Sequence, residues 1–248
     1  LHHHFGLKAG DRIAVQLPNL LQYPVVVIAA WKLGLVIVNT NPMYTHRELV
    51  HQFNDSGAKA VVVLDQFYET LAAALPETGI EHVVVTRAID LLPQPKKAVL
   101  TVLTKILGKR PALPGSGFIP FSQIVTASEQ SDYPAHSPAL EDICALQYTG
   151  GTTGVSKGVM LTQSSIMHNI AQALSMVNVG DDSIDNYTVV SPLPLYHIYA
   201  YMLSMGLTPA VRGHSLLIPD PRNISAFVGA IKNAKFEIFC GLNSLFVA

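Results

Sequence analysis

Short runs of β-branched residues alternate with helix-length stretches through the first half of the chain. The apolar runs recur about every twenty residues, a spacing typical of a parallel sheet whose strands are joined by crossover helices. Gly34 and Gly57 stand where the C-terminal caps of two of these helices are expected. The predicted strands are 12–16, 36–39, 60–64 and 82–85, and the predicted helices are 20–33, 45–56 and 67–75. The pattern predicts an α/β fold with mainly parallel sheets flanked by helices.

The alternation resumes after residue 138 and predicts a second α/β unit. Residues 116–138 hold few periodic apolar positions and several Gly, Ser and Pro, so they are interpreted as a connecting loop. The later predicted strands are 142–148, 187–190, 215–218 and 237–240, and the later predicted helices are 166–177 and 224–232. We therefore expect two α/β subdomains, 1–135 and 136–248. Leu1 is not an initiator methionine and Ala248 stands in an apolar segment, so we expect a fragment, truncated at its C-terminal end.

Residues 93–120 form a basic, amphipathic insertion between Pro-rich edges. Apolar residues fall at helical spacing there, and the Lys and Arg residues cluster towards the two ends of the stretch. The apolar positions are Val99, Val102, Leu103, Ile106 and Leu107. Two interpretations stay open: an amphipathic helix packed on the surface of the domain, or a short interfacial helix on anionic lipid.

The stretch 146–162 has the composition of a phosphate-binding loop. Glycines allow the backbone to come close to an anion, hydroxyls donate hydrogen bonds, and Lys157 adds a full positive charge. The glycines are Gly150, Gly151 and Gly154, and the hydroxyl residues are Thr149, Thr152, Thr153 and Ser156. Successive N–H groups in such a turn form an anion-binding nest. A strand before the loop and a helix after it would expose further amides at the helix entrance.

Two common nucleotide motifs are excluded by register. The residue before Lys157 is Ser156, so the Gly-Lys-Ser/Thr of the Walker A pattern is absent. The spacing from Gly150 to Gly154 does not fit the dinucleotide fingerprint. A flexible Gly/Ser/Thr linker is the remaining alternative, although a linker needs neither a terminal lysine nor an apolar lead-in.

Composition limits the classes of partner. Charged residues make up 13% of the chain and hydrophobic residues 49%. Some apolar surface is therefore expected to contact a missing part of the same protein, a lipid-like ligand or a membrane face. The formal net charge of −1 argues against a general nucleic-acid binder, which needs a basic field. Cys144 and Cys240 belong to no Cys-x-x-Cys pattern, as expected for reduced thiols in a cytoplasmic protein.

The residues Tyr-Thr-Gly-Gly-Thr-Thr-Gly-Val-Ser-Lys-Gly at 148–158 resemble the signature loop of the adenylate-forming superfamily of acyl-CoA synthetases. More narrowly, the chain is similar to bacterial long-chain fatty-acid CoA ligases. Four further segments, 17–24, 38–44, 192–197 and 241–243, resemble that family in order and spacing. The resemblance implies the N-terminal domain of an acid–thiol ligase that activates fatty acids for degradation, with ATP, Mg²⁺ and coenzyme A and a medium to long acyl chain.

The resemblance also assigns residues. It implies catalytic roles for Thr149, Lys157 and His197, with the Thr149 hydroxyl near the metal. The loop that would bind ATP comprises Tyr148, Thr149, Gly150, Gly151, Thr152, Thr153, Gly154, Val155, Ser156, Lys157 and Gly158. The residues that would contact the acyl adenylate are His197, Tyr201, Gly241, Asn243 and Ser244. Tyr201 would gate the acyl tunnel, although many relatives carry another aromatic residue there.

The sequence departs from the family pattern in one respect. The later motifs of such enzymes, an aromatic-Gly-x-Thr-Glu, a Thr-Gly-Asp and a carboxy-terminal lysine, are absent from these 248 residues. We therefore expect the fragment alone to be inactive. The alternatives are an aryl-CoA ligase, a fatty acyl-AMP ligase, or a non-catalytic nucleotide-binding module. A homodimer and a peripheral contact with the inner face of the cell membrane stay open.

Overall fold

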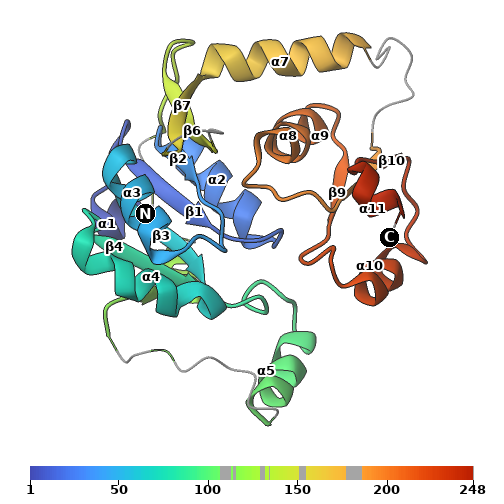
Figure 1. Cartoon of the computed structure of the whole chain (residues 1–248), viewed down its shortest axis with the longest axis horizontal. Coiled ribbons are helices and arrows are strands. Elements are labelled where there is room, and N and C mark those ends of the chain that lie inside the picture. The colour runs from blue at the N-terminus through green and yellow to red at the C-terminus, as the bar shows by residue number, and fades with distance from the viewer. Residues whose placement is uncertain are drawn as a thin grey trace.

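The computed structural model describes residues 1–106, 113, 116–128, 132–133, 135–150, 155–176 and 186–247. Within these ranges the larger sheet has seven strands in the order β5-β4-β3-β1-β2-β6-β7 (Figure 1). All neighbouring strands in it are parallel except β6 and β7. The strands are β1 Arg12–Gln16, β2 Val36–Asn39, β3 Ala58–Leu64, β4 His82–Thr86, β5 Ile119–Pro120, β6 Ile143–Thr149 and β7 Lys157–Thr162. The predicted mainly parallel α/β fold is confirmed.

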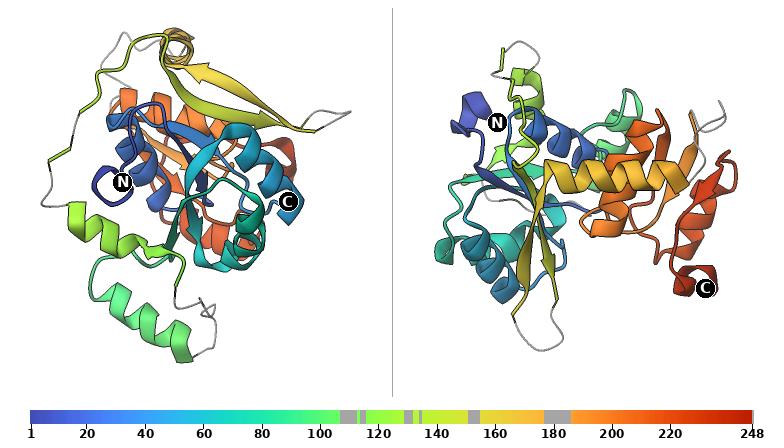
Figure 2. Two further views of the ribbon diagram at one scale, coloured as in Figure 1. Left: turned by 90° about the vertical axis from the view of Figure 1, so that its left-hand side faces the viewer. Right: turned by 90° about the horizontal axis from the view of Figure 1, so that it is seen from above.

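Helices cover both faces of this sheet because side chains alternate along its strands (Figure 2). Ile13, Val15 and Val62 belong to the core that includes α2, whereas Ala14, Val61 and Val63 belong to the core that includes α3 and α4. The helices of this region are α1 His2–Phe5, α2 Gln22–Lys32, α3 His46–Ser56, α4 Tyr68–Ala74 and α6 Phe121–Ser128, with 3₁₀ turns at Asp65–Phe67 and Leu75–Glu77. Each fully buried Val or Ile contributes about 1.5–3 kcal/mol.

A smaller parallel sheet follows, with three strands in the order β10-β8-β9. Its own core is small and centres on Val190, Ile218 and Phe227. The helix α7, Gln163–Met176, runs from the end of β7 towards this second unit (Figure 1). The remaining elements are β8 Thr188–Ser191, α8 Ile198–Tyr201, a π-helix Met202–Leu207, α9 Thr208–Ala210, β9 His214–Leu217, α10 Ile224–Ile231, β10 Ile238–Phe239 and α11 Asn243–Val247.

One predicted loop is wrong. Residues 116–138 contain β5 and α6 rather than only a connection, because Phe121 and Ile124 are buried in the core on the α2 face. The larger sheet also continues beyond residue 135, since β6 pairs with β2. The division into subdomains 1–135 and 136–248 stays a prediction, although the sheet itself does not break there.

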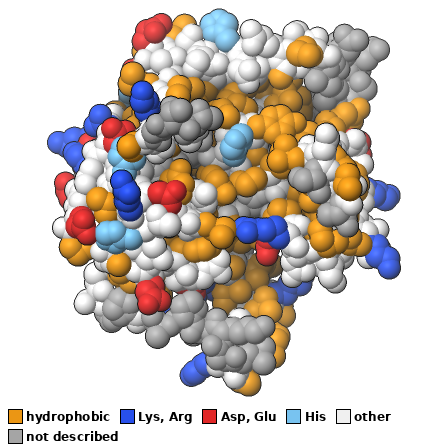
Figure 3. Space-filling model, in the orientation of Figure 1, with side chains coloured by type: hydrophobic (Ala, Val, Ile, Leu, Met, Phe, Trp, Pro, Cys, Tyr) orange, Lys and Arg blue, Asp and Glu red, His pale blue; other side chains and the backbone are white. Residues whose placement is uncertain are grey.

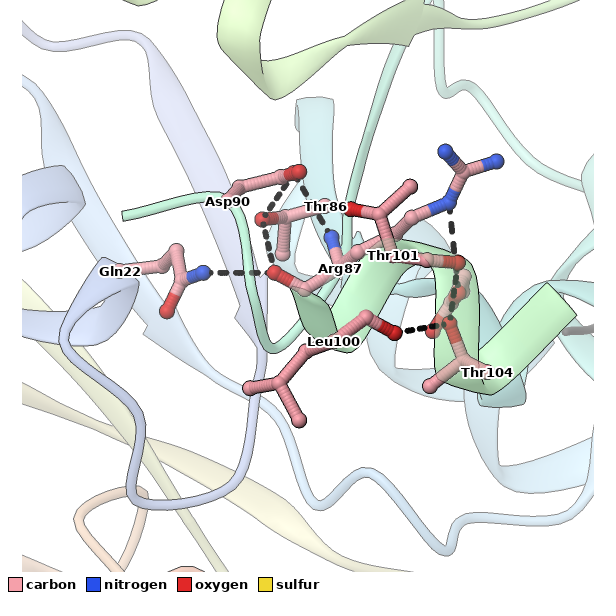
Figure 4. A network of polar contacts seen from close by, with 8 residues as sticks. Gln22, Thr86, Arg87, Asp90, Leu100, Thr101 and Thr104 are labelled. Atoms are coloured by element: carbon pink, nitrogen blue, oxygen red, sulfur yellow. Dashed lines mark hydrogen bonds and ion pairs between the residues drawn. The ribbon is translucent and has the colours of Figure 1, made fainter. Parts of the chain in front are cut away.

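The predicted basic helix is present as α5, Lys96–Ile106, and none of its side chains is buried. Its base is fixed to the sheet by a polar network (Figure 4). The Asp90 carboxylate accepts hydrogen bonds from the Arg87 N–H at 2.8 Å and the Thr86 hydroxyl at 3.1 Å. The Gln22 amide donates to the Arg87 carbonyl at 2.8 Å, and Lys97 Nζ donates to the Asp90 carbonyl at 2.8 Å. The helix is therefore tethered at its first turn while its apolar side chains stay exposed.

Apolar side chains cover much of the middle of the face shown in Figure 3, whereas charged side chains gather mainly beside the larger sheet. Exposed large apolar residues occur on α2, α5, α7 and α10, among others. No helix in the described ranges is long and apolar enough to cross a membrane.

Candidate functional site

The predicted phosphate loop is the turn of an antiparallel hairpin. In the register of β6 and β7, Thr149 faces Lys157 and Tyr148 faces Gly158. The hydroxyl and the cation that the sequence assigns to phosphate binding are therefore neighbours at the mouth of the loop, and both residues are exposed. Gly151, Thr152, Thr153 and Gly154 lie outside the described residues.

The expected helix entrance directly after the loop is wrong. The strand β7 intervenes between the loop and α7, so backbone amides at the start of α7 do not face the loop. The sequence carried only a partial signal, because the short apolar run Val159, Met160 and Leu161 before Thr162 fits either a strand or a helix. Pairing with β6 satisfies the backbone groups of this run, whereas a helix there would leave the edge of β6 unpaired.

The helix α3 holds both ends of the loop. The Tyr148 hydroxyl donates to the Asp55 carboxylate at 2.6 Å, and His51 Nε2 donates to the Ser156 carbonyl at 2.8 Å. The His51 and Tyr148 rings also meet edge to face, with centroids 6.5 Å apart. Burial is the main cause that raises the pKa of Tyr148 well above its usual range, and the nearby Asp55 carboxylate is the second cause. The hydroxyl therefore stays protonated and acts as a donor.

Local sequence explains why α3 has these limits and why the hairpin closes tightly. The Thr45 N–H donates to the Glu48 carboxylate at 2.7 Å before the first turn of α3, and Gly57 ends the helix at a φ of 61°. On the opposite strand, a Cβ at Gly158 would come within 2.9 Å of the Tyr148 ring. Any larger residue at Gly158 would therefore displace the ring that reaches Asp55.

The segment 192–197 follows the carboxyl end of β8 and presents His197 to solvent. His197 caps α8, since its Nδ1 accepts the Tyr199 N–H at 3.4 Å. A ring nitrogen that accepts this bond carries no proton, so the proton of the neutral ring is on Nε2. His197 can therefore offer an N–H donor to an oxygen of a bound ligand.

A direct contact joins this segment to the phosphate loop. Gln147 lies on β6 two residues before Thr149, and its amide donates to the carbonyl of Tyr196 at 2.9 Å. The structure therefore brings Thr149, Lys157 and His197 to the same edge, beyond the carboxyl ends of the parallel strands. Ligands of open α/β sheets bind at this edge.

The other predicted acyl contacts are placed less directly. Gly241 and Asn243 follow the carboxyl end of β10, which pairs with β8, so they lie at the same edge as His197. The Ser244 side chain lies outside the described residues. Tyr201 is only 1% exposed and packs edge to face against Trp31, with ring centroids 5.9 Å apart. Tyr201 is therefore part of the hydrophobic core, and its role as a gate stays a prediction.

A cleft of about 610 Å³ lies beneath the hairpin. Tyr148, Gly158, His136 and Asp142 are among the residues that line it, but Thr149, Lys157 and His197 are not. In the described ranges no group of three or more His, Cys, Asp or Glu residues could hold a metal ion. The exposed Thr149 hydroxyl is an oxygen ligand of the kind that Mg²⁺ prefers, and most of the remaining ligands would have to come from phosphate oxygens and water.

A hydroxyl and a lysine face each other at a glycine-rich turn, on the carboxyl edge of a mainly parallel sheet, and these features define an α/β protein with a candidate phosphate-binding turn. Comparison with known families identifies it further. The family described as "AMP-binding enzyme" matches residues 1–248, and the chain belongs to this family.

Three similar proteins place the chain within that family. It is 38% identical to the long-chain-fatty-acid–CoA ligase of Salmonella typhimurium, over 98% of this chain and 43% of the ligase. It is 30% identical to 4-coumarate–CoA ligase 2 of Oryza sativa, over 95% of this chain and 39% of that enzyme. A crystal structure of a long-chain-fatty-acid-CoA ligase from Archaeoglobus fulgidus superimposes with a TM-score of 0.68 and 26% identity, over 92% of this chain and 39% of that one. The chain thus spans less than half the length of these relatives.

Proposed function

We propose that the protein containing these 248 residues is an ATP-dependent fatty-acid CoA ligase. The observation that carries the proposal is the hydrogen bond from Gln147 to Tyr196, which joins the strand that leads to Thr149 with the residue before His197. The 38% identity to a long-chain-fatty-acid–CoA ligase supports the choice of substrate. The resemblance favours a medium to long acyl chain.

The proposed reaction has two steps. A carboxylate oxygen of the fatty acid attacks the α-phosphorus of ATP, the bond to the bridging oxygen of the β-phosphate breaks, and pyrophosphate leaves. The sulfur of coenzyme A then attacks the acyl carbon, the bond to the AMP oxygen breaks, and the thiol proton passes to solvent. Negative charge develops on pyrophosphate in the first step, so catalysis needs cationic and N–H groups at the terminal phosphates.

The residues at the hairpin mouth fit this need. Lys157 would hold the departing phosphates electrostatically, and backbone amides beginning at Gly150 would donate to their oxygens. Thr149 would supply a protein oxygen to Mg²⁺, which offsets phosphate charge when bound. The Nε2–H of His197 would orient the carboxylate of the fatty acid. No side chain needs to act as a nucleophile.

The test is Lys157→Ala in the protein that contains these residues, measured by fatty-acid-dependent exchange of pyrophosphate into ATP. Removal of a charge that stabilises the transition state lowers the exchange rate about 100-fold or more. Lys59→Ala is the matched control, because Lys59 pairs with Asp11 at 2.7 Å and not with the hairpin. An exchange rate that Lys157→Ala leaves unchanged rules out this role for the loop.

The alternatives separate in the same assays. An aryl-CoA ligase exchanges pyrophosphate with an aromatic acid but not with a fatty acid, and a fatty acyl-AMP ligase forms the adenylate without consuming coenzyme A. A non-catalytic module binds ATP or an acyl-AMP analogue in calorimetry without exchange.

A cytoplasmic location is supported by two free cysteines, of which Cys144 is buried. A homodimer stays a prediction.

We also propose that α5 makes a peripheral contact with anionic lipid. Val102 is 56% exposed and Ile106 is 74% exposed, and three lysines with no acidic residue complete the charge of the helix. The hydroxyls of Thr101 and Thr104 donate to carbonyls within the helix, so they need no water when the apolar side is covered. Basic residues beside an apolar helical face are typical of interfacial helices.

Sedimentation with phosphatidylglycerol vesicles tests the contact. The double variant Val102→Ser and Ile106→Ser should reduce the bound fraction several-fold, since membrane binding scales with buried apolar area. The matched control removes two exposed apolar residues elsewhere, Met167→Ser and Val228→Ser, and should bind like the unmodified protein. Equal sedimentation of both double variants contradicts a specific role for α5, and equal binding to phosphatidylcholine vesicles contradicts the role of the lysines.

A further inference from the structure

Four buried polar side chains form one hydrogen-bonded network behind the proposed site: Tyr23, Asn39 and Gln147 are bonded directly, and Asn19 joins them through the backbone of Leu195. Asn19, Tyr23, Asn39 and Gln147 are each less than a tenth exposed. They come from four different elements: the loop after β1, the first turn of α2, the end of β2, and β6. Because a buried amide without partners is costly, such a group persists only when its bonds are made.

The central link joins neighbouring strands. Asn39 and Gln147 face each other in the register of β2 and β6, and Asn39 Nδ2 donates to Gln147 Oε1 at 3.0 Å. Gln147 Nε2 then donates to the Tyr196 carbonyl. On the other side, the Tyr23 hydroxyl donates to Asn39 Oδ1, and the Gln52 amide donates to the Asn39 carbonyl at 3.0 Å. Rotation of the Gln147 amide by 180° would place a donor against a donor and an acceptor against a carbonyl, so its orientation is set.

Two members of this network, Asn19 and Tyr23, also bond to the backbone that leads to His197. Asn19 Nδ2 donates to the carbonyls of Ser191 and Leu193 at 3.0 and 2.8 Å, and the Leu195 N–H donates to Asn19 Oδ1 at 2.9 Å. The Tyr23 hydroxyl also lies 2.9 Å from the Leu195 carbonyl, so its single proton is shared between two acceptors. Side chains from the larger sheet and its loops therefore contact the backbone of Ser191, Leu193, Leu195 and Tyr196.

We propose that Asn39 and Gln147 are positioning residues that set the place of His197 relative to the phosphate loop. The proposal rests on the proposed function. Gln147 is two residues from Thr149 on the same strand, and its amide is bonded to the residue before His197. Attack of the carboxylate on the α-phosphorus needs the two reactants held in line, and an error of about 1 Å in such a geometry costs about 100-fold in rate.

The substitution Gln147→Met removes both bonds while keeping the side-chain length. We expect it to lower the kcat of adenylate formation about 100-fold, with a change of less than about threefold in the KM for ATP. Gln22→Met is the matched control, because Gln22 is also buried and its amide donates to the Arg87 carbonyl, away from His197. The control should lose similar thermal stability and keep its kcat. Equal loss of kcat in the two variants overturns the proposal.

Two further variants separate positioning from general destabilisation. Asn39→Leu combined with Gln147→Met should be no slower than the slower single variant, because the two residues act as one unit. In Gln147→Glu, a protonated carboxyl can donate to the Tyr196 carbonyl and still accept from Asn39. Its rate relative to the unmodified protein should therefore rise as the pH falls. Rates that multiply in the double variant, or a ratio independent of pH, contradict the proposal.

One measurement needs no substrate. Hydrogen–deuterium exchange of peptides covering 192–201 should be faster in Gln147→Met than in Gln22→Met. Unchanged exchange there overturns the positioning role whatever the activity. If the unmodified protein shows no exchange of pyrophosphate with any fatty acid, the proposed function fails, and the deuterium measurement still reports on the link between Gln147 and the segment.

Discussion

The contact between Tyr148 and Asp55 offers a direct test of how α3 supports the phosphate loop. Tyr148→Phe removes one hydroxyl and leaves the buried ring in place beside Gly158. The lost hydrogen bond has a charged acceptor at 2.6 Å, a class that contributes about 1.5–3 kcal/mol. Asp55 is exposed, so water can replace the hydroxyl at its carboxylate. We therefore expect the free energy of unfolding to fall by about 1–1.5 kcal/mol, at or below the lower end of that range.

The functional effect should be larger on binding than on chemistry. Tyr148 begins the loop, and His51 holds Ser156 at its other end. Loss of the Tyr148 bond should therefore make the loop proposed to bind phosphate more mobile, without removing any group proposed to contact the phosphates. The KM for ATP should rise several-fold, with a smaller change in kcat. Urea unfolding and pyrophosphate exchange measure the two effects.

Tyr133→Phe is the control for this substitution, since Tyr133 is exposed and its ring lies 5.8 Å from Lys32 Nζ, away from the hairpin. It should change neither the free energy of unfolding nor the KM. If Tyr148→Phe also changes neither quantity, the idea that α3 fixes the loop is refuted. Asp55→Asn should reproduce part of the effect, and the double variant should be less than additive.

Two other predictions concern buried groups. Tyr201→Ala removes the ring that packs on Trp31, so a gate role predicts an altered rate profile against acyl chain length, and an unaltered profile removes that role. Burial raises the pKa of Cys144 from 9.0 to about 11, so between these pH values the folded protein keeps a proton that the unfolded chain releases. The Tm should therefore fall more steeply with pH in this window than it does in Cys144→Ala, and parallel curves for the two proteins contradict the assignment.

The sequence could predict those parts of the fold that depend on a pattern within one short segment of the chain. The apolar runs of β1 to β4 and the chemistry of the loop at 148–158 need only local pattern. The helix α6 was missed because it lies in a stretch rich in Gly, Ser and Pro, and its burial depends on contacts with β4 and β5. The strand β7 was missed because a short apolar run after a glycine-rich turn suits either a strand or a helix until its partner is known.

The anchors of the site were invisible for a different reason. His51 and Asp55 lie about a hundred positions before the loop ends they hold, and the bonded pairs are 105 and 93 positions apart. An isolated histidine or aspartate on a helix has no pattern that indicates such a partner. The Asn39 and Gln147 link depends on strand order, since β2 and β6 become neighbours only when the sheet is assembled.

The three bonds of Asn19 have a consequence for biosynthesis. They join positions 172 to 176 residues apart, so the backbone before His197 cannot settle when the first strands emerge from the ribosome. At a synthesis rate of about 5–20 residues per second, roughly 10–35 s pass between the appearance of Asn19 and that of its partners. During that interval the Asn19 amide has none of these three partners, so the backbone before His197 takes up its final position only after residue 195 has been synthesised.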